Sequence, residues 1–189
     1  MIISIKQADR VVVGYTVSDL VPLATVADCI DPENISIKFA PSGHMIAFVR
    51  SGRSADLFLY DEQFENMPIT PQAIARDTIA YIKRKLKQNN QPLGKHGDWD
   101  NMLIICDNQH IYTVNTQFDF REEGDYIAVG PDAISGTLKS VLDATTDLYA
   151  EDRMVKALDI VAKVHKQNLY PLVVTDSKTQ QFKVIHKGA

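Results

Sequence analysis

Residues 1–16, MIISIKQADRVVVGYT, decide the fold of this 189-residue chain. Two apolar runs with strand character, Ile2–Lys6 and Arg10–Thr16, flank the short polar stretch Gln7-Ala8-Asp9. A short polar connection between two such runs is typical of an antiparallel hairpin. The sequence therefore predicts that the chain enters a buried sheet at its second residue.

The rest of the chain alternates blocks of strands with blocks of helices. Asn34–Ala40 alternates polar and apolar residues, with Ile35, Ile37 and Phe39 on one face, and Pro41-Ser42-Gly43 predicts a turn into the next strand. The predicted elements after the opening hairpin are strands at Asn34–Ala40 and His44–Arg50, helices at Ser54–Gln63 and Pro71–Gln88, strands at Met102–Cys106, His110–Asn115 and Asp125–Val129, helices at Pro131–Thr145 and Glu151–Gln167, and strands at Pro171–Thr175 and Gln181–His186. Val17–Glu33 has no clear period and is predicted to be an irregular excursion.

The helices are predicted from their start signals and apolar stripes. Thr70 suits an N-cap and Pro71 the first helical position, where its missing N–H would have no partner in any case. The predicted buried stripes are Ala75, Ile79, Ile82 and Leu86; Ile134, Leu138, Val141 and Leu142; and Met154, Ala157, Leu158, Val161 and Val164.

The order of these blocks indicates the architecture. A strict alternation of strand and helix would predict a doubly wound parallel sheet. The observed order of strands, helices, strands, helices and strands instead predicts an α/β protein in which two antiparallel sheets pack together and a helix pair covers each outer face. One domain over residues 1–189 is expected, since no linker or repeat is visible.

Composition and charge exclude several classes of function. Hydrophobic residues make up 45% and charged residues 23% of the chain, and the net charge of −4 gives no nucleic-acid footprint. No apolar stretch is long enough to span a bilayer and no signal-peptide pattern is present, so a cytoplasmic protein without a membrane partner is expected. Cys29 and Cys106 lie far apart in the sequence and are expected to be reduced thiols.

Motifs for cofactors and metals are absent from the sequence. The histidines have neither HxH nor HxxxH spacing, and Gly94 and Gly97 fit neither a dinucleotide fingerprint nor a phosphate loop. The polar stretch Lys95–Asp100 is expected to be a surface loop rather than a metal or substrate site. No cofactor and no metal are therefore predicted.

Four stretches in their order along the chain carry a resemblance to a known group. They are MIISIKQADRVVVGYT, MIAFVRSGRSAD at residues 45–56, MLIICDNQHIYTVN at residues 102–115, and DYIAVGPDAISGTLKSVLDATTDLYAEDRMVKALDIVAK at residues 125–163. Together they resemble the proteasome β-subunit and HslV peptidase group of N-terminal-nucleophile (Ntn) hydrolases. The resemblance implies a four-layer αββα sandwich.

The resemblance also implies a set of catalytic residues, and each can be compared with the matching position in this sequence. Such enzymes use a terminal Thr, Ser or Cys as nucleophile and its own α-amino group as base, with a lysine, an aspartate and a glycine N–H assisting. Here the nucleophile position falls at or just before Met1, and Met1-Ile2 supplies neither hydroxyl nor thiol. The aspartate falls on Thr16, and the nearest lysine to the expected position is Lys38. Gly52 matches the group's glycine, whose backbone N–H assists the reaction.

Two further positions depart from the group's pattern. The serine that follows the glycine before the third helix falls on Pro131, and the Asp and Ser before the next-to-last strand have no counterpart in Lys166–Tyr170. The leading hypothesis is therefore a non-catalytic, oligomeric scaffold or binding protein of this type. The alternatives are a peptidase or amidase with a relocated nucleophile, with Thr16, Lys38 and Gly52 as candidates, and a binding module whose cleft holds a ligand.

Partners are predicted from one apolar run. Residues Leu57, Phe58, Leu59 and Tyr60 cannot all face one core from a single helix, so at least one is expected on the surface. A homo-oligomer is predicted with Ser54–Gln63 at the contact and Pro71–Gln88 as a further candidate segment, and a ring ATPase is a further candidate partner.

Overall fold

The computed structural model describes residues 1–16, 37–49 and 53–186, and the predicted excursion Val17–Glu33 lies outside these ranges. The first sheet has the order β10-β9-β2-β1-β8. Its strands are β1 (Ile2–Gln7), β2 (Arg10–Thr16), β8 (Tyr126–Val129), β9 (Leu172–Asp176) and β10 (Lys183–Ile185). Every pairing is antiparallel, and β1 and β2 form the predicted opening hairpin, which the strand order places inside the sheet.

The second sheet follows the chain in simple sequence order, β3-β4-β5-β6-β7, again with antiparallel pairs. Its strands are β3 (Ile37–Phe39), β4 (Met45–Phe48), β5 (Leu103–Cys106), β6 (Ile111–Val114) and β7 (Phe120–Glu122). Strand β7 is missing from the sequence prediction. Its three residues, Phe-Arg-Glu, lie at the sheet edge and are mostly exposed, so they carry no apolar alternation.

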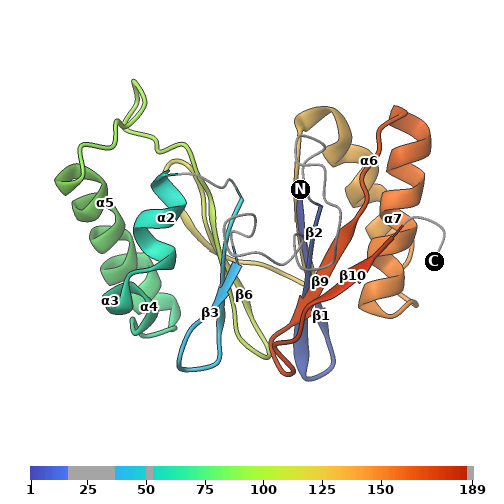
Figure 1. Cartoon of the computed structure of the whole chain (residues 1–189), viewed down its shortest axis with the longest axis horizontal. Coiled ribbons are helices and arrows are strands. Elements are labelled where there is room, and N and C mark those ends of the chain that lie inside the picture. The colour runs from blue at the N-terminus through green and yellow to red at the C-terminus, as the bar shows by residue number, and fades with distance from the viewer. Residues whose placement is uncertain (17–36, 50–52, 187–189) are drawn as a thin grey trace.

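Helices cover both outer faces of the paired sheets. Those over the second sheet are α2 (Arg53–Leu59), α3 (Glu62–Glu65), α4 (Pro71–Ala73), the π-helical segment η1 (Ile74–Thr78) and α5 (Ile79–Gln88). Those over the first sheet are α6 (Asp132–Asp143) and α7 (Ala150–His165). Figure 1 shows the resulting sequence of helices, sheet, sheet and helices, which confirms the predicted four-layer αββα arrangement.

Three apolar clusters fill the spaces between the four layers. The inter-sheet cluster contains Ile2, Val11, Val13, Tyr15, Ile37, Met45, Ala47, Ile104, Cys106, Ile111 and Val173. The aromatic cluster lies between the second sheet and α2–α5 and includes Phe48, Phe58, Phe64, Tyr81, Trp99 and Phe118. The aliphatic cluster lies between the first sheet and α6–α7 and includes Ile3, Ile5, Leu138, Leu142, Met154 and Leu158.

The predicted helix Ser54–Gln63 is two helices. Helix α2 ends at Leu59, and Asp61 begins α3 by accepting hydrogen bonds from the backbone N–H groups of Gln63 and Phe64. An aspartate at an N-cap competes with continuation of the preceding helix, because its carboxylate satisfies the first N–H groups of a new one.

The helix predicted at Pro71–Gln88 begins as expected, since Thr70 Oγ1 accepts from Ala73 N at 3.1 Å. Its buried stripe is wrong at Ala75, which is exposed, while Ile74 and Thr78 are buried. The π-helical turn at Ile74–Thr78 holds an extra residue, which rotates the buried face before α5 begins. The predicted stripe of α7 also fails at Val164, which is exposed.

The prediction that the run Leu57–Tyr60 leaves a residue exposed is confirmed. Tyr60 is 64% exposed, but Phe58 is completely buried in the aromatic cluster. A charged residue at position 58 would therefore disrupt the core rather than test a contact between subunits.

Candidate functional site

The first candidate place is the chain start, where the side chains of β1 alternate between two faces. Ile2 lies in the inter-sheet cluster, whereas Ile3 and Ile5 lie in the aliphatic cluster. Met1 packs against the aliphatic cluster, and a Cβ added to Gly130 would lie 3.2 Å from Met1 Cγ. The Met1 side chain therefore faces the helices, and the inter-sheet side of β1 begins with Ile2, a residue that has no nucleophilic atom.

The groups around Met1 are held by backbone contacts. Thr16 N donates to Met1 O at 3.0 Å, which fixes the end of β2 beside the chain start. Burial lowers the pKa of the Met1 α-amino group below its ordinary value. The hydroxyl of Ser135 donates to the carbonyls of Gly130, at 3.2 Å, and Pro131, at 3.1 Å. That hydroxyl therefore stabilises the start of α6 by hydrogen bonds to the backbone just before the helix.

Two of the three residues proposed from the sequence, Thr16 and Lys38, lie in the described ranges, on different sheets. Thr16 is half-buried at the end of β2, and Gly52 lies outside the described residues. Lys38 projects from β3 on the side opposite Ile37, forms an ion pair with Glu65, and lies 5.7 Å from the centre of the Tyr60 ring. Lys38 thus faces the layer of α2 and α3, away from the inter-sheet side.

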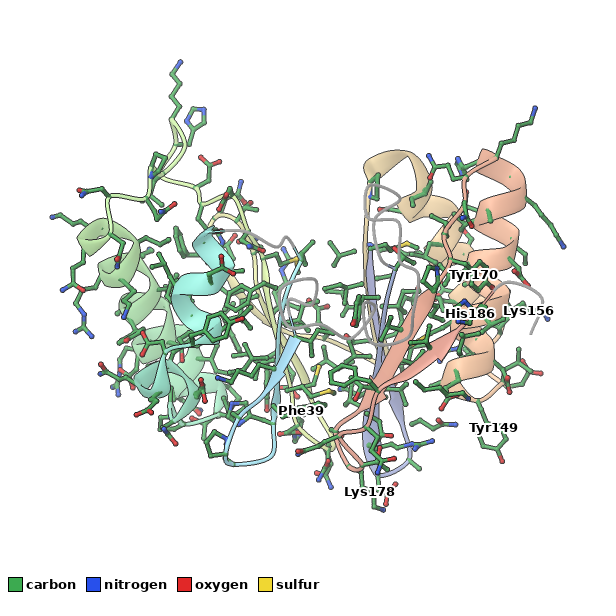
Figure 2. All side chains as sticks on the ribbon, in the orientation of Figure 1. Phe39, Tyr149, Lys156, Tyr170, Lys178 and His186 are labelled. Carbon is green, nitrogen blue, oxygen red and sulfur yellow. The ribbon has the colours of Figure 1, made fainter. Side chains whose placement is uncertain are left out.

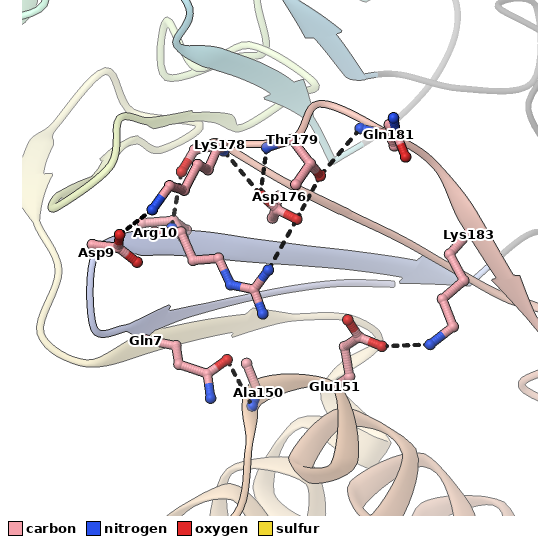
Figure 3. A network of polar contacts seen from close by, with 12 residues as sticks. Gln7, Asp9, Arg10, Ala150, Glu151, Asp176, Lys178, Thr179, Gln181 and Lys183 are labelled. Atoms are coloured by element: carbon pink, nitrogen blue, oxygen red, sulfur yellow. Dashed lines mark hydrogen bonds and ion pairs between the residues drawn. The ribbon is translucent and has the colours of Figure 1, made fainter.

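The second candidate place is a cavity of about 500 Å³ at the turn end of the molecule. Turns from both sheets and the segment between α3 and α4 line it, with Ser42, His44, Met67, Asp107, Ser177 and Lys178 among the lining residues. Figure 2 shows Lys178 at this end of the molecule, while Phe39 lies between the two sheets. Figure 3 shows the turn that carries Lys178 tied down by the ion pairs Lys178–Asp9 and Arg10–Asp176.

His44 and Ser177 are buried polar residues of this cavity, and His44 has 4% of its surface exposed. Its Nδ1 lies 2.5 Å from Ser42 Oγ, and its Nε2 is buried without a hydrogen-bond partner among the described residues. Burial lowers the pKa of His44, and the neighbouring Asp107 carboxylate opposes this shift. A neutral imidazole has one donor and one acceptor nitrogen, so His44 can offer Nε2 in only one of these roles at a time.

Asp107 lies beside His44 because of the strand register. Met45 pairs with Cys106, so the next position along the antiparallel pair places His44 opposite Asp107. Burial alone would raise the pKa of Asp107, but the N–H groups of Gln109 and His110 and the His110 ring lower it overall. Asp107 Oδ2 lies 3.0 Å from His110 Nδ1.

The cluster of Ser42, His44, Asp107 and His110 was not predicted. The sequence does place polar residues at the turn before β4 and at the turn between β5 and β6. Predicting that they meet required the register between β4 and β5.

No group of three or more His, Cys, Asp or Glu side chains in the described ranges is placed to hold a metal ion. Cys106 is buried as expected, and burial raises its pKa to about 12. Cys29 lies outside the described residues.

Comparison with solved structures identifies the architecture. *Thiobacillus denitrificans* BPH in complex with epoxomicin matches with a TM-score of 0.69 and 15% identity over 93% of this chain and 96% of BPH. The chain has the proteasome-type Ntn-hydrolase fold. *Trypanosoma brucei* HslV, at a TM-score of 0.59 and 15% identity, covers 93% of this chain and 97% of its own. Anbu, the ancestral β-subunit from *Yersinia bercovieri*, reaches 0.64 at 13% identity over 99% of this chain and 87% of its own.

These similarities show the proteasome-type fold alone, because the sequence identities are low. No protein-family model matches the sequence, and no curated protein matches it. No helix in the described part of the chain is both long and apolar enough to cross a membrane.

Proposed function

We propose that this chain is a non-catalytic proteasome- or HslV-like subunit that acts as an oligomeric scaffold or binding protein. The observation that carries the proposal is the placement of Lys38 on the helix-facing side of β3, paired with Glu65. An Ntn nucleophile requires a hydroxyl or thiol and a nearby cation on the inter-sheet side. Support comes from Lys38, which is paired with Glu65, and from Ser4 on the inter-sheet side, which is completely buried beside Cys106.

Intact mass after treatment with epoxomicin tests this proposal. *T. denitrificans* BPH serves as the positive control, since its structure holds that inhibitor. The expected result is an unchanged mass for this chain, with Met1 retained, and no turnover of fluorogenic tripeptides. An inhibitor adduct on the purified protein, lost in a Thr16→Val variant, would overturn the proposal.

The assembly part of the proposal is a homo-oligomer, with a ring ATPase as a candidate partner. Tyr60 supports a contact at the end of α2, because this exposed aromatic ring adjoins the half-exposed Lys38 on the same face. Light scattering of the purified chain should give a mass well above 21.1 kDa. Tyr60→Glu should lower that mass, whereas the matched substitution Tyr149→Glu, at an exposed tyrosine on the other helix layer, should not. A monomer at all concentrations refutes the oligomer.

A hydrolase with a relocated nucleophile is the second candidate, and the Ser42–His44 contact favours it. The hydroxyl of Ser42 meets an imidazole nitrogen beside a cavity, which is the arrangement that activates a serine. A fluorophosphonate probe should label Ser42 in this case, and Ser42→Ala should abolish the label. Absence of labelling on the folded protein eliminates Ser42 as the nucleophile.

A further inference from the structure

A second cavity, of about 380 Å³, lies between the end of β1 and the start of α7. Its lining includes Gln7, Thr146, Asp147, Tyr149, Ala150 and Arg153. It is distinct from the cavity around His44 and from the chain start. Its lining comes from the opening hairpin, the connection between α6 and α7, and the first turn of α7.

Arg153 is the unusual residue of this cavity, because only 5% of its surface is exposed. Its Nη2 donates to Leu142 O at 2.8 Å, and its Cζ lies 5.7 Å from the centre of the Tyr126 ring. Its Nε is buried and has no hydrogen-bond partner in the part of the chain that the structure describes. None of the ion pairs formed among the described residues includes Arg153.

A buried guanidinium without a carboxylate is costly. Arginine cannot release its proton at physiological pH, so it cannot escape burial by becoming neutral. Buried charges in folded proteins are almost always paired or bound to an ion. The carbonyl of Leu142 at the end of α6 and the face of Tyr126 compensate part of the charge. The Nε donor of the guanidinium is left without an acceptor among the described residues.

The N-terminal end of α7 borders the same cavity. This helix of 16 residues has no side-chain cap at Tyr149. Gln7 Oε1 accepts from Ala150 N at 3.3 Å, as Figure 3 shows, which holds the carboxamide of Gln7 against the first turn. The N-terminal end of a helix carries a partial positive charge that favours anions.

The nearby carboxylates set the electrostatic balance. Glu151 in the first turn is paired with Lys183 at 2.8 Å, and Asp143 accepts from the Tyr126 hydroxyl at 2.7 Å. Asp152 is exposed on α7, and Asp147 is exposed on the cavity lining. Of these acids, Asp147 is the one that would repel an incoming anion at the cavity itself.

We propose that this cavity binds the oxyanion group of a small molecule, a phosphate or a carboxylate, through Arg153 and the first turn of α7. A guanidinium offers parallel N–H donors that match the oxygen spacing of both groups. The cavity volume is within the usual range for small-molecule sites. The inference does not depend on whether the chain is catalytic.

Thermal unfolding and heteronuclear NMR of the full chain test the site with inorganic phosphate and acetate as probes. Ionic strength is held constant with chloride, so that a general salt effect cancels. At about ten times the dissociation constant, the bound anion should raise Tm by about 4 °C. Amide signals of residues 146–153 should shift in a saturable manner. The stronger of the two probes identifies phosphate or carboxylate as the group recognised.

Matched variants separate the site from general screening. Arg153→Met should weaken binding at least about tenfold, whereas Arg121→Met, at an exposed arginine on β7, should leave it unchanged. Because Arg153→Met removes the contact with Leu142 and can impair folding, Asp147→Asn provides a second test. Loss of its carboxylate should tighten binding about threefold, which a merely structural arginine does not predict. No saturable shift with either anion, or equal binding in wild type and the Asp147→Asn variant, overturns the proposal.

Discussion

The two helix-covered layers of the molecule differ in whether their basic side chains are paired with carboxylates. In the aromatic layer over the second sheet, Lys38 is paired with Glu65, and Lys85 lies 2.7 Å from Asp61. In the aliphatic layer over the first sheet, Arg153 is more deeply buried than either lysine and forms no ion pair with a carboxylate among the described residues. Among the described residues, Lys38 and Lys85 in the first layer are paired with carboxylates, whereas Arg153 in the second layer is not.

The layers also differ in how they are packed. Phe58 lies in a group of rings, with centroid distances of 5.1 Å to Phe64, 5.9 Å to Phe48 and 6.3 Å to Trp99. The other layer packs β2 closely against α7 at Gly14, where an added Cβ would lie 2.7 Å from Met154 Sδ. Large aromatic rings fill the layer over the second sheet. In the layer over the first sheet, the backbone of β2 at Gly14 packs closely against α7.

The largest expected effect is at the aromatic cluster. Phe58→Ala should cost about 3–5 kcal/mol of unfolding free energy, because it removes a completely buried ring and leaves a cavity. Chemical denaturation monitored by Trp99 fluorescence measures the change. Tyr60→Ala, two residues away and exposed, should stay within about 0.5 kcal/mol of wild type. A loss at Phe58 no larger than that at Tyr60 would contradict the packing described for this layer.

The close approach in the other layer gives the second effect. Gly14→Ala should cost about 1–3 kcal/mol, because its Cβ would overlap Met154 Sδ and lie 3.1 Å from Leu172 Cδ1. A double-mutant cycle that combines Gly14→Ala with Met154→Ala tests this cause. The shorter side chain at position 154 leaves room for the added Cβ, so the cost of Gly14→Ala should be smaller in that background. If the double variant shows only the sum of the two single losses, the contact with Met154 is not the source of the cost.

The charge network of the aromatic layer gives the third effect. Asp61 accepts from the N–H groups that begin α3, from Tyr81 Oη at 2.6 Å and from Lys85. Asp61→Ala should cost about 1–2 kcal/mol at neutral pH, as expected for a lost helix cap with an unpaired partner. Asp61→Asn serves as a second variant that keeps the shape of the side chain.

The acid dependence of the same group has a defined sign. Burial alone would raise the pKa of Asp61, but Lys85, Tyr81 and the N–H of Phe64 lower it overall. Its contribution is therefore present above the unfolded pKa of about 3.9 and is lost as pH falls through the folded value. The difference in stability between wild type and Asp61→Asn should shrink below pH ~4. A difference that is constant from neutral to acidic pH would show that the charge has no role.

Much of this fold follows from local patterns in the sequence. The opening hairpin, the hairpins at β3–β4 and β5–β6, and the order of the blocks were predicted because each buried strand is an apolar run beside a turn. The Thr70 cap was predicted for the same local reason. Strand β7 and the break at Asp61 were missed, because an exposed edge strand and a capped second helix have no distinct periodicity.

The candidate sites were harder to predict, because their groups meet through long-range packing. Ala75 was placed in the core by an ideal helical period, and the π-helical turn of Ile74–Thr78 changes that period. Arg153 sits beside Met154 in a helix whose apolar stripe was otherwise read correctly up to Val161, yet nothing local marks an arginine as buried. The His44–Asp107 pair required the register between two strands that lie far apart in the sequence.

The smallest expected effect concerns His44, which, like Arg153, has a buried nitrogen without a hydrogen-bond partner among the described residues. The two differ in one respect, since an imidazole can lose its proton and a guanidinium cannot. Burial lowers the pKa of His44 in the folded state, although Asp107 opposes the shift. Below the unfolded value of about 6.5 the unfolded chain therefore binds a proton that the folded chain does not.

The folded state should consequently lose stability as pH falls below about 6.5, and this loss should stop below the folded pKa of His44. His44→Asn should flatten this part of the stability profile, and the slope is the quantity to compare, because the variant also loses the contact with Ser42. Burial also lowers the pKa of the Met1 amine, which changes stability in a higher pH range, below the unfolded value near 8. This contribution is the same in wild type and in His44→Asn. His96→Asn, at an exposed histidine, should keep the wild-type slope. An unchanged slope in His44→Asn would mean that His44 binds its proton equally well in the folded and unfolded states, and would contradict the lowering of its pKa by burial.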